Sequence, residues 1–64
     1  MDEYLTTYEI DVLRWHTDQP QPASMNPDCR AAQAILAKLE YLERNGDGAF
    51  NITSKGLKRL AMAN

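Results

Sequence analysis

The fold predicted for this chain rests on residues 28–53, DCRAAQAILAKLEYLERNGDGAFNIT. The stretch begins as a helix, because its apolar residues recur at i, i+3, i+4 and i+7 and form one stripe. Asp28 follows Pro27 and places a carboxylate where it favours the positive end of a helix dipole. We therefore predict a helix over residues 28–41. Its apolar stripe consists of Ala32, Ile35, Leu36 and Leu39.

The second half of the stretch predicts a β-hairpin. Two short runs of alternating apolar and polar residues, 42–45 and 49–53, flank the turn sequence Asn45-Gly46-Asp47-Gly48. Asn-Gly and Asp-Gly pairs tolerate the positive φ angles of tight turns, so this pattern is the strongest short-range signal for a hairpin. A helix that leads directly into a small hairpin indicates an α+β domain.

Length and composition limit the protein to one small domain. A chain of 64 residues buries only about 60% of the surface of its unfolded state, so its core must be compact or shared with a partner. Apolar residues make up 44% and charged residues 25% of the chain, and both fractions are ordinary for a globular protein. We expect a single domain over residues 1–64.

The residue content disfavours several classes of protein. Cys29 is the only cysteine, which excludes an internal disulfide and a four-cysteine zinc site. No apolar run approaches the length of a membrane span and the acidic N-terminus lacks a signal-peptide core, so we expect a cytoplasmic protein. His16 and Cys29 stand without an orienting residue, an oxyanion feature or a cofactor motif. We predict no catalytic residue, no cofactor and no small-molecule substrate, with His16 on the surface and Cys29 at least half-buried.

The hairpin turn also resembles the start of a calcium-binding EF-hand loop. Glu43, Asn45 and Asp47 stand at alternate ligand positions, and Gly48 stands where that loop turns sharply. The twelfth position, however, is Ser54 instead of a bidentate glutamate, and a hairpin explains the same residues without a metal. We predict that no metal is bound.

The charges are distributed unequally along the chain. Residues 1–28 hold six acidic residues and one arginine, for a net charge of −5, whereas residues 29–64 hold six basic and three acidic residues, for +3. The whole chain is acidic, at −2. A basic half on an acidic protein is either a footprint for a polyanion or ordinary solvated charge, and both interpretations stay open on charge alone.

Two further helices are predicted around the central stretch. Thr6 and Glu9 form a capping box, which predicts a first helix that ends at residue 15 or 16. Residues 17–27 hold all three prolines and predict a loop, with one helical turn near residues 23–25. Thr53 or Ser54 caps a last helix. Its apolar stripe consists of Leu57, Leu60 and Ala61.

The first helix has apolar residues on two of its sides. Ile10 and Leu13 lie on one side, and the other side is formed by Tyr8, Val12 and Trp15. A core this small covers both sides with difficulty. The second side is therefore our candidate contact for a homodimer or another protein partner, and a core that wraps the whole helix is the alternative.

This order of elements resembles the winged-helix (winged helix-turn-helix) superfamily of small bacterial and phage transcription regulators. Four segments carry the resemblance. YEIDVLR at 8–14 is similar to the first helix, LAKLE at 36–40 is similar to the recognition helix, and LER at 42–44 with GAFNITSKG at 48–56 is similar to the wing and its following helix. The resemblance implies an α+β winged-helix-like domain, in which a helix-loop-helix is followed by a two-stranded β-hairpin wing and a C-terminal helix. The sequence departs from the family at residues 18–27, where prolines occupy the place of a helix, and at Glu40-Tyr41, where a glycine is usual.

The resemblance further implies binding to double-stranded DNA through the 28–41 helix and the 42–53 wing. The outer face of the helix would enter a major groove, where arginine and glutamine pair with bases and small alanines permit close approach. Groups at the wing would hold phosphates. The residues so implied are Arg30, Gln33, Ala34 and Lys38 on the helix, and Arg44, Asn45 and Lys55 at or near the wing. The alternative is a non-enzymatic protein-interaction module with the same fold that does not bind DNA.

Overall fold

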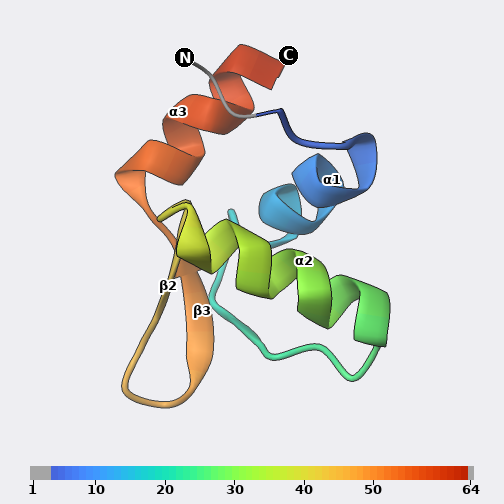
Figure 1. The fold of residues 1–64 in the computed structure, drawn as a ribbon. Helices are drawn as coiled ribbons and strands as arrows, with labels where there is room; N and C mark the ends of the chain where they lie inside the picture. The colour runs from blue at the N-terminus through green and yellow to red at the C-terminus, as the bar shows by residue number, and fades with distance from the viewer. Residues whose placement is uncertain (1–3, 64) are drawn as a thin grey trace.

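The computed structural model describes residues 4–63, which form three helices and a three-stranded sheet (Figure 1). The elements follow in the order α1 (Thr7–Trp15), β1 (Gln21–Pro22), α2 (Pro27–Lys38), β2 (Leu42–Arg44), β3 (Ala49–Ile52) and α3 (Ser54–Ala63). The strands are antiparallel and lie in the order β1-β3-β2. The predicted α+β class is confirmed, and the sheet has one strand, β1, that we did not predict.

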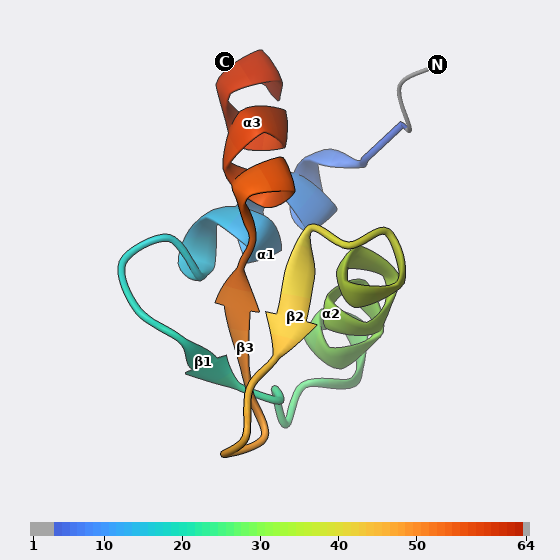
Figure 2. The ribbon, with the colours of Figure 1, turned by 90° about the vertical axis from the view of Figure 1, so that its left-hand side faces the viewer.

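The helices are arranged around this sheet so that each contacts at least one other helix or strand. Helix α2 packs against α1 and β2, and α3 packs against α1 and β3. Figure 2 shows the sheet with α3 continuing from the end of β3. The core between these elements consists of Leu5, Val12, Leu13, Ala32, Leu36, Tyr41, Leu42, Phe50 and Leu60.

The start of α1 is the predicted capping box. The Thr6 hydroxyl accepts a hydrogen bond from the Glu9 backbone N–H at 3.1 Å, and the Glu9 carboxylate accepts one from the Thr6 N–H at 2.9 Å. The predicted helical turn at residues 23–25 is wrong, because that segment has no helix. Just before it, Pro22 pairs with Ala49 on an edge strand, where a missing N–H is tolerated.

The hairpin of β2 and β3 is confirmed at the predicted place. The Asn45 carbonyl accepts a hydrogen bond from the Gly48 N–H at 3.1 Å, and the Asn45 N–H donates to the Ala49 carbonyl at 2.8 Å. Gly48 has a φ of 83° and is the residue of this turn with a positive φ. The connection is therefore a three-residue loop that ends in a left-handed residue, and not a two-residue turn.

Helix α2 ends at Lys38, earlier than predicted, in a Schellman-type cap. The Tyr41 N–H donates to the Leu36 carbonyl at 2.9 Å and the Glu40 N–H donates to the Ala37 carbonyl at 3.0 Å. Glu40 has a φ of 70°, the left-handed conformation for which glycine is preferred. A residue with a side chain adopts it at a cost of about 1–2 kcal/mol.

The apolar stripes of α2 and α3 are only partly as predicted. Leu36 is buried in α2 and Leu60 in α3, but Ile35 is 43% exposed and Leu57 is 51% exposed. Ala61 is exposed as well. In α2, Ala32, Leu36 and Leu39 pack in or against the core as predicted, and Ile35 is the member of the stripe that does not. Helix α3 turns a different side toward the core than its sequence pattern indicates. Helix α2 also buries a polar side chain, Gln33, which is described below.

Candidate nucleic-acid interface

Three of the predicted DNA-contacting residues form one exposed line on α2. Arg30, Ala34 and Lys38 are all exposed, and their i, i+4, i+8 spacing places them along one side of the helix over about 12 Å. The Arg30 Nε donates to the Ser24 carbonyl at 3.1 Å, which links its side chain to the loop before α2. We call Arg30, Ala34 and Lys38 the α2 ridge.

Gln33 does not belong to this outward surface, which corrects our prediction. Its side chain is fully buried. Its Oε1 accepts from the Ser24 N–H at 2.8 Å, and its Nε2 lies 3.1 Å from both the Pro22 carbonyl and the His16 Nε2. An amide engaged in this way satisfies the backbone of the loop between α1 and α2, and it cannot reach a base edge.

His16 is the other buried polar residue of this cluster, so the prediction of a surface histidine is wrong. It is 1% exposed, and its Nδ1 lies 2.8 Å from the Val12 carbonyl. Because a carbonyl only accepts, Nδ1 carries the proton and Nε2 accepts from Gln33. Burial lowers the pKa of His16, and the hydrogen bond to Val12 opposes this shift without reversing it. No sequence signal connects His16 with Gln33, since they are distant in the chain and neither belongs to a motif.

Arg44 is the cation that the hairpin offers. It is exposed on β2, with its guanidinium carbon 5.4 Å from the centroid of the Phe50 ring. Such a cation–π contact at an exposed site is worth about 0.5–1 kcal/mol and orients the guanidinium. The neighbouring Asn45 uses its side-chain oxygen within the turn, where it accepts from the N–H groups of Asp47 and Ala49.

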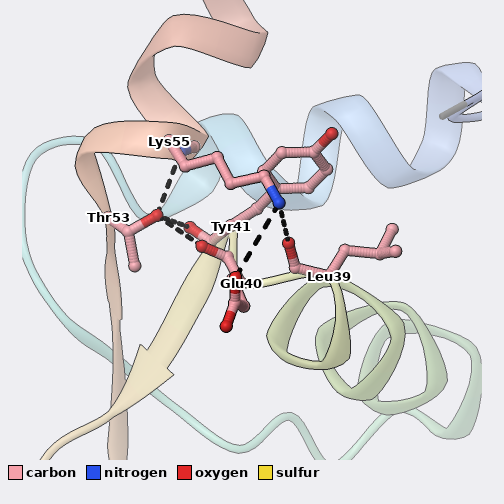
Figure 3. Close-up of polar contacts among 6 residues, drawn as sticks. Leu39, Glu40, Tyr41, Thr53 and Lys55 are labelled. Atoms are coloured by element: carbon pink, nitrogen blue, oxygen red, sulfur yellow. Dashed lines mark hydrogen bonds and ion pairs between the residues drawn. The ribbon is translucent and has the colours of Figure 1, made fainter. Parts of the chain in front are cut away.

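Lys55, which we predicted to contact a phosphate, makes contacts within the chain. Figure 3 shows its ammonium beside the last turn of α2, where it donates to the Leu39 carbonyl at 3.0 Å and lies 3.9 Å from the Glu40 carboxylate. The ammonium also lies 5.3 Å from the centroid of the Tyr41 ring. A cation at this place stabilises the negative end of the helix dipole. We therefore leave Lys55 out of the candidate interface.

Thr53 completes this junction between α2, β2 and α3 (Figure 3). Its hydroxyl lies 2.6 Å from the Glu40 carbonyl and 3.1 Å from the Tyr41 carbonyl, and it accepts from the Gly56 N–H at 3.0 Å. The Thr53 N–H donates to the Tyr41 carbonyl at 3.0 Å. These bonds fix the end of α2 to the end of the hairpin, and so they set the angle between the α2 ridge and Arg44.

Of the three α1 residues predicted to contact a partner, one is buried in the core and two are exposed. Val12 is 5% exposed and belongs to the core, which corrects its assignment to a partner surface. Tyr8 and Trp15 are 47% and 44% exposed. Tyr8 lines an open depression of about 320 Å³ between α1 and α2. Desolvation raises the pKa of the Tyr8 phenol, and the nearby Cys29 and Asp28 raise it further.

Comparisons of the chain with protein-family models, with curated proteins and with solved structures found no match. The structure itself describes a small α+β domain with an exposed basic ridge on α2 beside the β2–β3 hairpin. Among residues 4–63, no helix has the length and apolar character required to cross a membrane.

Proposed function

We propose that this protein is a small winged-helix-like DNA-binding domain of the kind that regulates transcription. The observation that carries the proposal is the α2 ridge. It places one cation on each side of a small alanine along an exposed face of the helix. Such a ridge suits a major groove, because alanine permits close approach while arginine pairs with guanine. Arg44 on the adjacent hairpin then contacts the phosphate backbone.

The junction around Thr53 supports the same proposal. A helix and a wing can bind one duplex together only if the angle between them is held, and the hydrogen bonds of Thr53 and Lys55 hold it. The affinity expected is low, since two or three cations contribute a slope of about −2 to −3 in a plot of log K against log salt. Two copies on one site would be needed for tight binding.

Fluorescence anisotropy with a labelled pool of random duplexes, at two salt concentrations, tests the proposal. Lys38→Ala should weaken binding to all sequences alike and make the salt slope shallower by about one unit. Arg30→Ala should relax the sequence preference found by selection, at a cost of about 1–3 kcal/mol on the preferred site. Arg14→Ala is the matched control, because it also removes one positive charge, from an exposed position on α1.

Two results would contradict the DNA-binding proposal. The first is an absence of salt-dependent binding at tens of micromolar protein in low salt, because non-specific DNA binders reach Kd values of about 10⁻⁴–10⁻⁶ M even at physiological salt. The second is an equal loss of binding in Lys38→Ala and Arg14→Ala, which would mean that net charge acts instead of the ridge.

A protein-interaction module is the second candidate function. The observation that favours it is the exposure of Tyr8 and Ile35, two large side chains that line the same depression. An exposed apolar depression of this kind suits a contact with another protein.

A further inference from the structure

The depression between α1 and α2 combines apolar and acidic side chains. Tyr8, Ala31 and Ile35 supply its apolar lining, and Glu9 and Asp28 supply its carboxylates. Tyr8 and Ile35 are nearly half exposed, at 47% and 43%. We call these five residues the α1–α2 groove. Its chemistry fits a ligand that is apolar along one face and carries a positive charge.

The outer side of α3 has the complementary chemistry. Leu57 and Met62 are 51% and 60% exposed, and Ala61 lies on the same side of the helix. Lys58 is exposed among them. The opposite side of α3, which includes Leu60, already packs into the core. We call Leu57, Lys58, Ala61 and Met62 the α3 outer face, and it leaves apolar area in water.

We propose that the α1–α2 groove binds the α3 outer face of a second copy of this chain. Apolar side chains then cover one another, and Lys58 of one copy meets the Glu9 and Asp28 carboxylates of the other. Charge complementarity selects this pairing, since groove against groove would oppose carboxylates and α3 against α3 would oppose lysines. Lys58 is the charge that the α3 outer face presents.

The two surfaces lie at different places on the molecule, so the contact is head-to-tail. In Figure 1 the N-terminal ends of α1 and α2 lie at the right, whereas α3 lies at the upper left. A contact between two different patches leaves one patch of each kind free at the ends, and it produces an open chain or, if the rotation closes, a ring. A symmetric dimer is not expected.

Two blocked variants provide the decisive experiment. Ile35→Glu places a charge in the apolar lining of the groove, and Leu57→Glu places one on the α3 outer face; both positions are exposed, so the fold should tolerate them. Analytical ultracentrifugation with reductant, which prevents a Cys29 disulfide, measures the mass over a dilution series. The wild-type mass should rise with concentration beyond a dimer, and each variant alone should stay monomeric.

The mixture of the two variants separates this proposal from other modes of association. Ile35→Glu keeps a working α3 and Leu57→Glu keeps a working groove, so the equimolar mixture should form a one-to-one heterodimer that grows no further. A dimer formed by either variant alone would indicate a symmetric contact and overturn the proposal. A wild-type chain that stays monomeric at every concentration would also overturn it.

Charge and folding controls complete the test. Lys58→Ala should raise the Kd of self-association by up to about fivefold, as loss of an exposed ion pair does. Added salt should act in the same direction. Circular dichroism verifies that each variant is folded. If Ile35→Glu unfolds, Ala31→Glu, also at an exposed position in the groove, takes its place and must give the same heterodimer.

Discussion

Mild acid should destabilise this protein through His16, the only histidine in the sequence. In the folded state the Nε2 of His16 accepts from the Gln33 amide, and a proton at Nε2 would place two donors 3.1 Å apart. The amide cannot simply rotate, because its oxygen already accepts from the Ser24 N–H and its nitrogen lies against the Pro22 carbonyl. The buried cluster therefore holds the imidazole neutral.

The direction and the size of the effect follow from the lowered pKa of His16. The unfolded chain has a histidine pKa of 6.5, so below that pH it binds more protons than the folded chain. Stability is fully present above the unfolded pKa and is lost as the pH falls from there toward the folded pKa. One pH unit below the unfolded pKa, the loss reaches up to about 1.4 kcal/mol. A domain of this length has about 3–10 kcal/mol in total, so the Tm should fall by up to about 10 °C.

Urea unfolding at about pH 7.5 and about pH 5.5, followed by far-UV circular dichroism, measures this difference, since histidine titrates between these values. His16→Gln is the control, because glutamine does not titrate and its amide oxygen can accept from Gln33 in place of Nε2. The wild type should lose stability between the two pH values and the variant should not. An equal loss in both proteins, or none in the wild type, would refute the role of His16.

Three other perturbations have defined outcomes. Glu40→Gly should raise the free energy of unfolding by about 1 kcal/mol, because glycine adopts the φ of 70° without strain; a lower urea midpoint would contradict this. Gly56→Ala should lower the Tm despite alanine's better helix propensity, because the new Cβ would overlap the Tyr41 carbonyl oxygen, and an unchanged Tm would show that the junction yields. Calcium and chelator should give superimposable NMR spectra, because Asn45 already uses its side-chain oxygen in the turn; saturable shifts at Asp47 would argue otherwise.

The features that the sequence predicted well are local ones. The capping box of Thr6 and Glu9 and the turn at Asn45 to Gly48 depend on residues within four positions of one another. The boundaries of α1 and of the hairpin are therefore close to those that the residue pattern indicates. In each case the hydrogen-bonding groups and the conformational preferences belong to the same short segment.

The features that the sequence did not predict depend on partners far away in the chain. The apolar pattern of α2 placed Ile35 in the core and Gln33 on the outer face, but the loop backbone and His16 need a polar partner on the inner side of α2, and Gln33 supplies it. Lys55 looked like a phosphate ligand because its partner, the Leu39 carbonyl, lies 16 positions away. A single helix stripe cannot indicate which neighbouring groups will need a hydrogen bond.

One copy can use the proposed DNA-binding and self-association surfaces at the same time, because they are formed by different rows of side chains on α2. The α2 ridge follows Arg30 and Lys38, whereas Ala31 and Ile35 belong to the next row of side chains and line the groove. Few cations per copy give weak binding to a duplex, but a head-to-tail chain presents several ridges at once, and linked sites bind far more tightly than single ones. Leu57→Glu should therefore weaken DNA binding at high protein concentration and leave the binding of a single copy unchanged, while Lys38→Ala should weaken both.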